Sequence, residues 1–254
     1  MKRLATALLL VPLALVAIFG PVWVMYTVTA VVAVLCFHEF SGIASAGGVD
    51  GLAPFGYIAG LALLFADRQI PLVVTGIALL ALTMPLAGAS LRETLPRASV
   101  LLFGVVYVFG TWKFAFLLRE VSPYWLLFAL FINWAGDAAA YYAGRAFGKH
   151  KLAPVISPKK TWEGSVASML ASVVLGTAYI AYFLPATPVW FTVAVAAAGN
   201  VAGQVGDLAE SAIKRGAGVK DSGTVLPGHG GMLDRVDSTL FALPVVYLSV
   251  ILPR

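Results

Sequence analysis

The segment from Gly206 to Ser238 contains most of the side chains in this chain that could do chemistry. Between two apolar segments it concentrates five carboxylates, four basic side chains and one histidine, namely Asp207, Glu210, Asp221, Asp234 and Asp237, then Lys214, Arg215, Lys220 and Arg235, and His229. A glycine-rich turn, residues 227–231, lies among them. Carboxylates suit a divalent cation, whereas basic side chains and backbone N–H groups bind phosphate oxygens. The pattern predicts a site where a divalent cation holds a polyphosphate; the alternative is a solvated loop between membrane helices.

A second polar segment, Ala143–Ser165, is rich in cations. Its basic residues are Arg145, Lys149, Lys151, Lys159 and Lys160. The run Ser157-Pro-Lys-Lys-Thr161 would offer hydroxyl and ammonium groups to phosphate oxygens from a turn that we expect Pro158 to hold. The alternative is a basic anchor on anionic lipid headgroups. Neither a P-loop nor a dinucleotide-binding glycine turn occurs, because the glycine spacings after Gly144 and Gly216 do not match either motif.

Two carboxylates, Asp137 and Asp207, lie within or at the ends of apolar runs. An ionised side chain at the centre of a membrane helix costs about 2.5–3.5 kcal/mol, so a functional role is the first hypothesis for both. On a helix, Asp207 would share one face with Glu210, Ser211 and Lys214. Two helix ends could then direct their acids at one ion; the alternative is that each acid is only neutralised by a nearby Lys or Arg.

Composition places these residues in a polytopic, all-α membrane protein. Of the 254 residues, 60% are apolar and 11% charged, with a mean hydropathy of +0.91, which excludes an ordinary soluble domain. A net charge of +5 would suggest nucleic-acid binding in a soluble protein, but here it reflects membrane topology, and we expect no nucleic-acid partner. The single cysteine, Cys36, excludes an intrachain disulfide.

Nine apolar runs predict about nine transmembrane helices in one membrane domain, with N-terminal helices over residues 1–98 and the active site within 99–254. The runs are Leu4–Phe19, Val22–Phe37, Leu52–Ala66, Ile70–Ala89, Ser99–Leu118, Tyr124–Tyr142, Val166–Phe183, Val189–Glu210 and Thr239–Leu252. The first is interpreted as an uncleaved helix, because it lacks a clear signal-peptide cleavage site.

Basic residues predict the orientation. With a cytoplasmic N-terminus, thirteen of the seventeen Lys and Arg residues fall on the cytoplasmic side, against Arg68, Arg119 and Arg254 outside and Lys113 within a span. Both polar segments are therefore expected to face the cytoplasm.

The polar segments also carry a set of motifs. These are Ser211-x-x-Lys214-Arg215, Lys220-Asp221-x-Gly223 and Leu226-Pro227-x-His229-Gly230-Gly231-x-x-Asp234-Arg235-x-Asp237, preceded by Asp137-x-x-x-Tyr141, Gly144-Arg145-x-Phe147-Gly148-Lys149, Ser157–Thr161 and Gly206-Asp207-Leu208-x-Glu210-Ser211. Together they resemble the phosphatidate cytidylyltransferases, or CDP-diacylglycerol synthases, over Asn133 to Ser238. Departures occur at Ala138, where the family has Ser or Thr, and at Ala167 and Ser168, where it has two glycines.

The resemblance implies a Mg²⁺-dependent membrane enzyme of phospholipid biosynthesis, which converts CTP and phosphatidic acid to CDP-diacylglycerol and pyrophosphate. It would act as a homodimer at the cytoplasmic face of a membrane, the inner (plasma) membrane of a bacterial cell. The resemblance also allows a second, monovalent cation such as K⁺. The implied metal ligands are Asp207 and Asp234, with Asp137 and Asp237 in support. The implied catalytic residues are Asp207, Asp234, Lys214, Arg215, Lys220, Arg235 and His229. The implied substrate-binding residues are Ser157, Lys159, Lys160, Thr161, Ser211, Asp221, Gly230 and Gly231.

Two other functions remain open from the residues. A CTP-dependent polyprenol kinase would share a metal–nucleotide site but transfer the γ-phosphate. A secondary transporter would also keep acids in its helices, although near the membrane midplane rather than gathered at one face.

Overall fold

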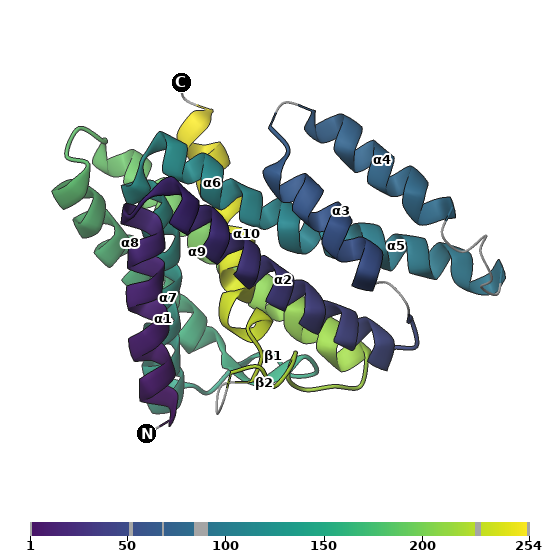
Figure 1. Cartoon of the computed structure of the whole chain (residues 1–254). Coiled ribbons are helices and arrows are strands. Elements are labelled where there is room, and N and C mark those ends of the chain that lie inside the picture. The colour runs from purple at the N-terminus through teal and green to yellow at the C-terminus, as the bar shows by residue number, and fades with distance from the viewer. Residues whose placement is uncertain (1, 51–52, 68, 84–90, 227–229, 253–254) are drawn as a thin grey trace. The chain divides into compact units, whose positions relative to one another are not determined.

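Apolar runs of this length become helices, because a backbone surrounded by lipid must satisfy its hydrogen bonds within the segment. The computed structural model describes residues 2–50, 53–67, 69–83, 91–226 and 230–252. Within them the helices are α1 (Lys2–Phe19), α2 (Val22–Ala46), α3 (Ala53–Phe65), α4 (Ile70–Thr83), α5 (Thr94–Val105), α6 (Thr111–Val121), α7 (Pro123–Phe147), α8 (Trp162–Phe183), α9 (Val189–Gly216) and α10 (Leu233–Ile251). A 3₁₀ turn, η2 (Leu91–Glu93), precedes α5, and a π-helical turn, η3 (Val106–Gly110), joins α5 to α6. Figure 1 shows this order of elements along the chain.

Where the structure describes them, the nine predicted apolar runs lie on helices except at a few end residues, so the all-α membrane class is confirmed. Leu52 of the third run and residues 84–89 of the fourth lie outside the described residues. Among the residues that the structure describes, four helical segments are long and apolar enough to cross a membrane, namely Val22–Ala46, Leu91–Val121, Trp162–Phe183 and Val189–Gly216. The run Ser99–Leu118 is part of the second of these, where η3 connects α5 and α6 without ending the helix. The count of nine crossings stays a prediction.

The helices pack into two units. Unit 1 comprises Met1–Lys113 and Ile213–Arg235, and unit 2 comprises Phe114–Ala212 and Val236–Arg254. The boundary divides both α9 and α10, so the polar segment that ends α9 and begins α10 contributes residues to each unit. The single membrane domain stays a prediction.

In unit 1, α2, α3 and α5 pack through aromatic rings set against glycines. The Phe37 ring occupies the space that a side chain at Gly56 would need, and the Phe40 ring does the same at Gly104. Figure 1 shows α3 and α4 beside α5. The glycines therefore allow close helix contacts in which aromatic rings, rather than a second backbone, fill the space.

Lys113 is the one basic residue predicted inside a span, and it is buried. Its ammonium group donates to the carbonyl oxygens of Leu64, at 3.3 Å, and Ala66. These carbonyls lie at the C-terminal end of α3, where a cation stabilises the helix dipole and satisfies unpaired acceptors. The charge thus serves the packing of unit 1.

In unit 2, α9 is held to α8 by amide and hydroxyl side chains. Asn200 of α9 donates to the hydroxyl groups of Ser168, at 2.9 Å, and Ser172, at 2.8 Å, on α8. One turn later, Gln204 donates to Asn200 at 2.6 Å and exchanges hydrogen bonds with Ser165. Ser168, which replaces the glycine expected from the resemblance, is therefore part of this network. Since buried polar groups must be paired, the network specifies how α9 sits against α8.

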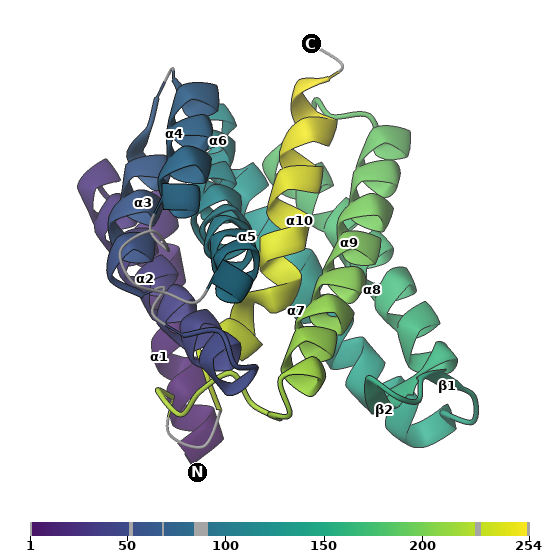
Figure 2. The same cartoon turned by 90° about the vertical axis from the view of Figure 1, so that its right-hand side faces the viewer.

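Between α7 and α8 the chain forms a hairpin of β1 (Lys151–Ala153) and β2 (Ser157–Thr161), antiparallel with Lys151 opposite Thr161. The expectation that Ser157–Thr161 is a turn held by Pro158 was wrong. Proline lacks an N–H but its φ suits extended backbone at an edge, so Pro158 is tolerated in a two-stranded sheet. Figure 2 shows the hairpin at the ends of α7 and α8.

Candidate active site

Asp207 and Lys160 form the first part of the site, in unit 2. The network around Asn200 and Gln204 positions α9, and Asp207 lies one turn beyond Gln204. The Lys160 ammonium nitrogen, on β2, lies 2.5 Å from a carboxylate oxygen of Asp207, and both side chains are partly exposed. Ser211 also donates to the Asp207 carboxylate, at 3.4 Å. The structure therefore brings together a predicted metal ligand and a predicted phosphate-binding lysine that are 47 residues apart in sequence.

Thr161 and Lys159, on the same strand, have different surroundings. Thr161 is buried, and its hydroxyl oxygen accepts a hydrogen bond from the Gly164 N–H at 3.2 Å, so it caps the N-terminus of α8. Lys159 and Pro158 are exposed. The cap holds the strand to the helix, and the binding roles of Ser157, Lys159 and Thr161 stay predictions.

Carboxyl groups gather around Asp237 in unit 2. The negative charges of Asp207, Glu210 and Asp137 all act on the Asp237 carboxyl, which also accepts the Ser238 N–H at 2.6 Å. Gly206 permits this approach, because a Cβ there would lie 2.7 Å from the Asp237 carbonyl oxygen.

The negative charge of this cluster favours cation binding, although its carboxyl groups are not arranged as a formed coordination site. Asp237 is 8% exposed and Glu210 is 1% exposed, and buried like charges need protons or a counter-charge. An all-oxygen donor set of this kind fits Mg²⁺. Within the residues that the structure describes, no three carboxylate, imidazole or thiol groups already converge as metal ligands.

Asp234 and Lys214 form a second pair, in unit 1. The Lys214 ammonium group contacts one carboxylate oxygen of Asp234, while the other accepts the backbone N–H groups of Ser222, at 3.0 Å, and Gly231, at 2.9 Å. Burial raises the pKa of Asp234, but these hydrogen bonds and the Lys214 charge outweigh it and hold that pKa below its ordinary value. Gly230, with φ +79°, makes room for the carboxylate, since a Cβ there would lie 2.8 Å from it. Asp234 therefore carries a charge at neutral pH.

The other predicted residues of this segment are more exposed. Arg215 is exposed and donates to the Val219 carbonyl oxygen at 3.0 Å. Lys220, Asp221 and Arg235 are also exposed, as is Asp137 in unit 2. His229 lies outside the described residues.

Glu39, on α2, was not among the site residues predicted from the sequence. Its buried carboxylate accepts hydrogen bonds from the N–H groups of Met232, at 2.9 Å, and Leu233, at 2.8 Å. It also accepts the Ser222 hydroxyl at 3.0 Å. The signal was present, because Glu39 lies two residues beyond the apolar run Val22–Phe37, and the rule applied to Asp137 would have selected it.

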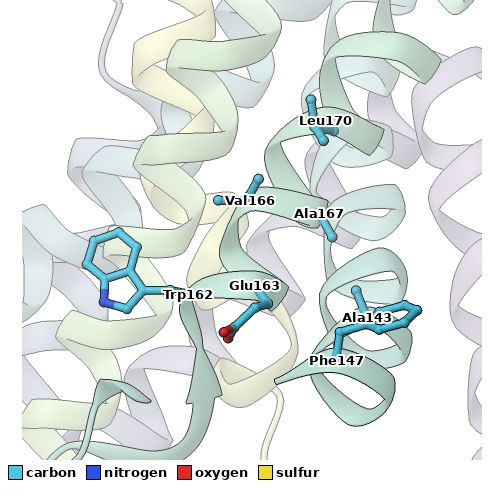
Figure 3. A pocket seen from close by; sticks show the side chains of 7 residues that line it. All are labelled: Ala143, Phe147, Trp162, Glu163, Val166, Ala167 and Leu170. Atoms are coloured by element: carbon cyan, nitrogen blue, oxygen red, sulfur yellow. The ribbon is translucent and has the colours of Figure 1, made fainter. Parts of the chain in front are cut away.

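An apolar groove of 540 Å³ lies beside the hairpin, on α7 and α8. Figure 3 shows Ala143 and Phe147 of α7 together with residues of the first turns of α8. The lining residues are Ala143, Phe147, Trp162, Glu163, Val166, Ala167 and Leu170. Glu163 is bonded to the His150 ring at 2.7 Å. The surface is suited to a hydrocarbon chain.

The sequence model of the cytidylyltransferase family matches residues 1–252. The chain belongs to the cytidylyltransferase family. Among its relatives, the phosphatidate cytidylyltransferase of Staphylococcus aureus (strain COL) is 42% identical over 160 residues, and those of Staphylococcus saprophyticus and Staphylococcus haemolyticus are 40% and 39% identical over the same length. Each match covers 63% of this chain and 62% of the relative. The resemblance inferred from the motifs is confirmed.

In this cytidylyltransferase-family protein, the pairs Lys160–Asp207 and Lys214–Asp234 share one design. Each joins an acid predicted to bind metal with a lysine predicted to bind phosphate. A cation that binds the acid would release the ammonium group for a phosphate oxygen.

Proposed function

We propose that this protein is a phosphatidate cytidylyltransferase, which uses CTP and phosphatidic acid to make CDP-diacylglycerol and pyrophosphate for phospholipid biosynthesis. The observation that carries the proposal is the pairing of acids and lysines from the family motifs, Lys160 with Asp207 and Lys214 with Asp234. The names of the relatives and the family membership support it.

In the proposed reaction, an oxygen of the lipid phosphate forms a bond to the α-phosphorus of CTP. The bond from that phosphorus to the β-phosphate oxygen breaks, and pyrophosphate leaves with the electron pair. Such a transfer needs positioning and charge neutralisation more than covalent help from the protein. The triphosphate would be held by Lys214, Arg215, Lys220 and Arg235, with His229, Ser211, Asp221, Gly230 and Gly231 lining the nucleotide site.

Asp207 and Asp234, supported by Asp137 and Asp237, would hold Mg²⁺, and a monovalent cation could bind beside it. When bound, Mg²⁺ supplies positive charge to the polyphosphate and its leaving group. The buried acid cluster around Asp237 supports this assignment, because its charges need compensation.

The hairpin would bind the lipid phosphate through Ser157, Lys159, Lys160 and Thr161. The groove lined by Phe147 and Val166 supports this role, because it offers an apolar surface beside the hairpin for an acyl chain. We also propose a homodimer as the working form.

Two labelled forms of CTP test the reaction. Purified protein is incubated with phosphatidic acid, Mg²⁺ and either α-³²P or γ-³²P CTP. We expect the α label in lipid and the γ label in pyrophosphate. Lipid labelled only from the γ position would overturn the proposal in favour of the polyprenol kinase type of chemistry.

For topology, we propose nine crossings in a bacterial inner membrane, with both polar segments cytoplasmic. A reporter placed within Ala143–Ser165 should be cytoplasmic, and one fused after Arg254 should be outside, because thirteen basic residues lie on the inner side. A cytoplasmic reporter after Arg254 would mean that one short run, such as Leu52–Ala66, does not cross.

A further inference from the structure

We propose that Glu39 and Ser222 are positioning residues that orient the Asp234 carboxylate for cation binding. The inference rests on the proposed role of Asp234 as a metal ligand. It assigns a function to α2, an element outside the motif-bearing segments, and all the contacts that support it lie within unit 1.

Glu39 organises the start of α10. Its two carboxylate oxygens accept the N–H groups of Met232 and Leu233 and the hydroxyl group of Ser222. The side chain is almost fully buried, with 3% exposed. A carboxylate is favoured here because the first N–H groups of a helix lack partners within the helix and carry positive partial charge.

Ser222 connects Glu39 to Asp234. Its hydroxyl donates to Glu39 at 3.0 Å and accepts the Asp234 N–H at 3.3 Å, while its own N–H donates to the Asp234 carboxylate at 3.0 Å. A displacement of Glu39 would therefore move both the main chain and the side chain of Asp234.

The two carboxylate oxygens of Asp234 have different hydrogen-bond donors, and only one of the oxygens faces a cationic side chain. Oδ2 accepts the backbone N–H groups of Ser222 and Gly231, whereas Oδ1 faces the Lys214 ammonium group. Glu39 takes the next two N–H groups, those of Met232 and Leu233. Oδ2 is thus held by the turn, and Oδ1 is the oxygen that can exchange Lys214 for a metal ion.

Two glycines, Gly223 and Gly231, lie closely against Glu39. A Cβ at Gly223 would lie 2.8 Å from the Glu39 side chain, and one at Gly231 would collide with both Ser222 and Glu39. An apolar side chain at this position would leave the N–H groups of Met232 and Leu233 without their acceptor. Glu39 satisfies them and, through Ser222, also orients the Asp234 carboxylate.

The test compares Glu39→Gln and Ser222→Ala with the control Ser41→Ala, which removes from the same helix a hydroxyl that has no hydrogen-bond partner among the described residues. Mn²⁺ binding is measured by paramagnetic resonance, the Mg²⁺ requirement by activity, and folding by thermal unfolding in detergent. In folded Glu39→Gln and Ser222→Ala we expect Mn²⁺ affinity to fall about 10-fold or more, with the half-saturating Mg²⁺ rising in parallel. The KM for phosphatidic acid should not change, and the control should match the original protein.

A purely structural role predicts a lower unfolding temperature with unchanged Mn²⁺ affinity in the folded protein, and that result would overturn the inference. If Glu39→Gln does not fold, Ser222→Ala decides, because its hydroxyl is the direct link to Asp234. Absence of Mn²⁺ binding to the original protein would also overturn it. Failure of the proposed function is a separate result, since the labelled-CTP assay would fail while Mn²⁺ binding still responds to Glu39.

Discussion

Asp234→Asn should lower CDP-diacylglycerol formation by more than about 100-fold. Replacing a residue that only supports a metal ligand already lowers metal affinity or activity by about 10–100-fold, so loss of a ligand itself should cost more. The substitution keeps the shape of the side chain but removes the charge that Lys214 contacts and that we propose binds the cation. Initial rates of α-³²P transfer to lipid, measured on folded protein, check the expectation. Asp50→Asn, at an exposed acid in the same unit, is the matched control.

The structure adds a stability cost to this prediction. The side chains of Lys214 and Asp234 are 9% and 8% exposed, and breaking a buried ion pair from one side costs about 3–5 kcal/mol. The double variant Lys214→Met/Asp234→Asn should regain most of the unfolding temperature, since both charges leave together, yet stay inactive. Full activity in folded Asp234→Asn would remove Asp234 from the site.

Lys160→Met and Asp207→Asn should have opposite effects on the metal requirement. Asp207→Asn should lose more than about 100-fold in activity and need more Mg²⁺, because it removes a proposed ligand. Lys160→Met should also lose activity, through the lost phosphate contact, but need less Mg²⁺. The ammonium group that occupies Asp207 at 2.5 Å is then absent. A partly exposed ion pair is worth about 0.2–1 kcal/mol, so the half-saturating Mg²⁺ should fall by up to about five-fold.

Mg²⁺ titrations of initial rate at saturating CTP measure this difference. Lys159→Met is the matched control, because Lys159 lies next to Lys160 on β2 and is exposed. It should lose activity without a change in the Mg²⁺ requirement. An unchanged or higher requirement in Lys160→Met would show that Lys160 does not compete with the cation for Asp207.

Much of the fold followed from the sequence, because helices in an apolar protein are determined locally. The described parts of the runs from Leu4–Phe19 to Thr239–Leu252 lie on helices, since each can satisfy its backbone within the segment. The motifs around Asp207 and Asp234 also identified the family, because the residues of each motif are close together in sequence and can be recognised without the structure.

The strand Ser157–Thr161 shows where prediction from the local sequence pattern failed. Proline and two lysines indicated a turn, but pairing with Lys151–Ala153 makes the segment extended, and the Thr161 cap joins it to α8. Pairing depends on a partner strand rather than on the five residues themselves.

Contacts between distant residues were decided only by the tertiary structure. The pairing of Lys160 with Asp207, the network from Ser165 to Gln204 and the hold of Glu39 on Ser222 each join segments far apart in the chain. Spacing along a helix shows which residues share a face, but it does not show which face of another helix they meet. The sequence by itself determined which acids and cations this protein has for its chemistry. The tertiary structure decided how those residues are paired, because buried groups such as Lys214, Asp234 and Glu39 must find their partners in other segments of the chain.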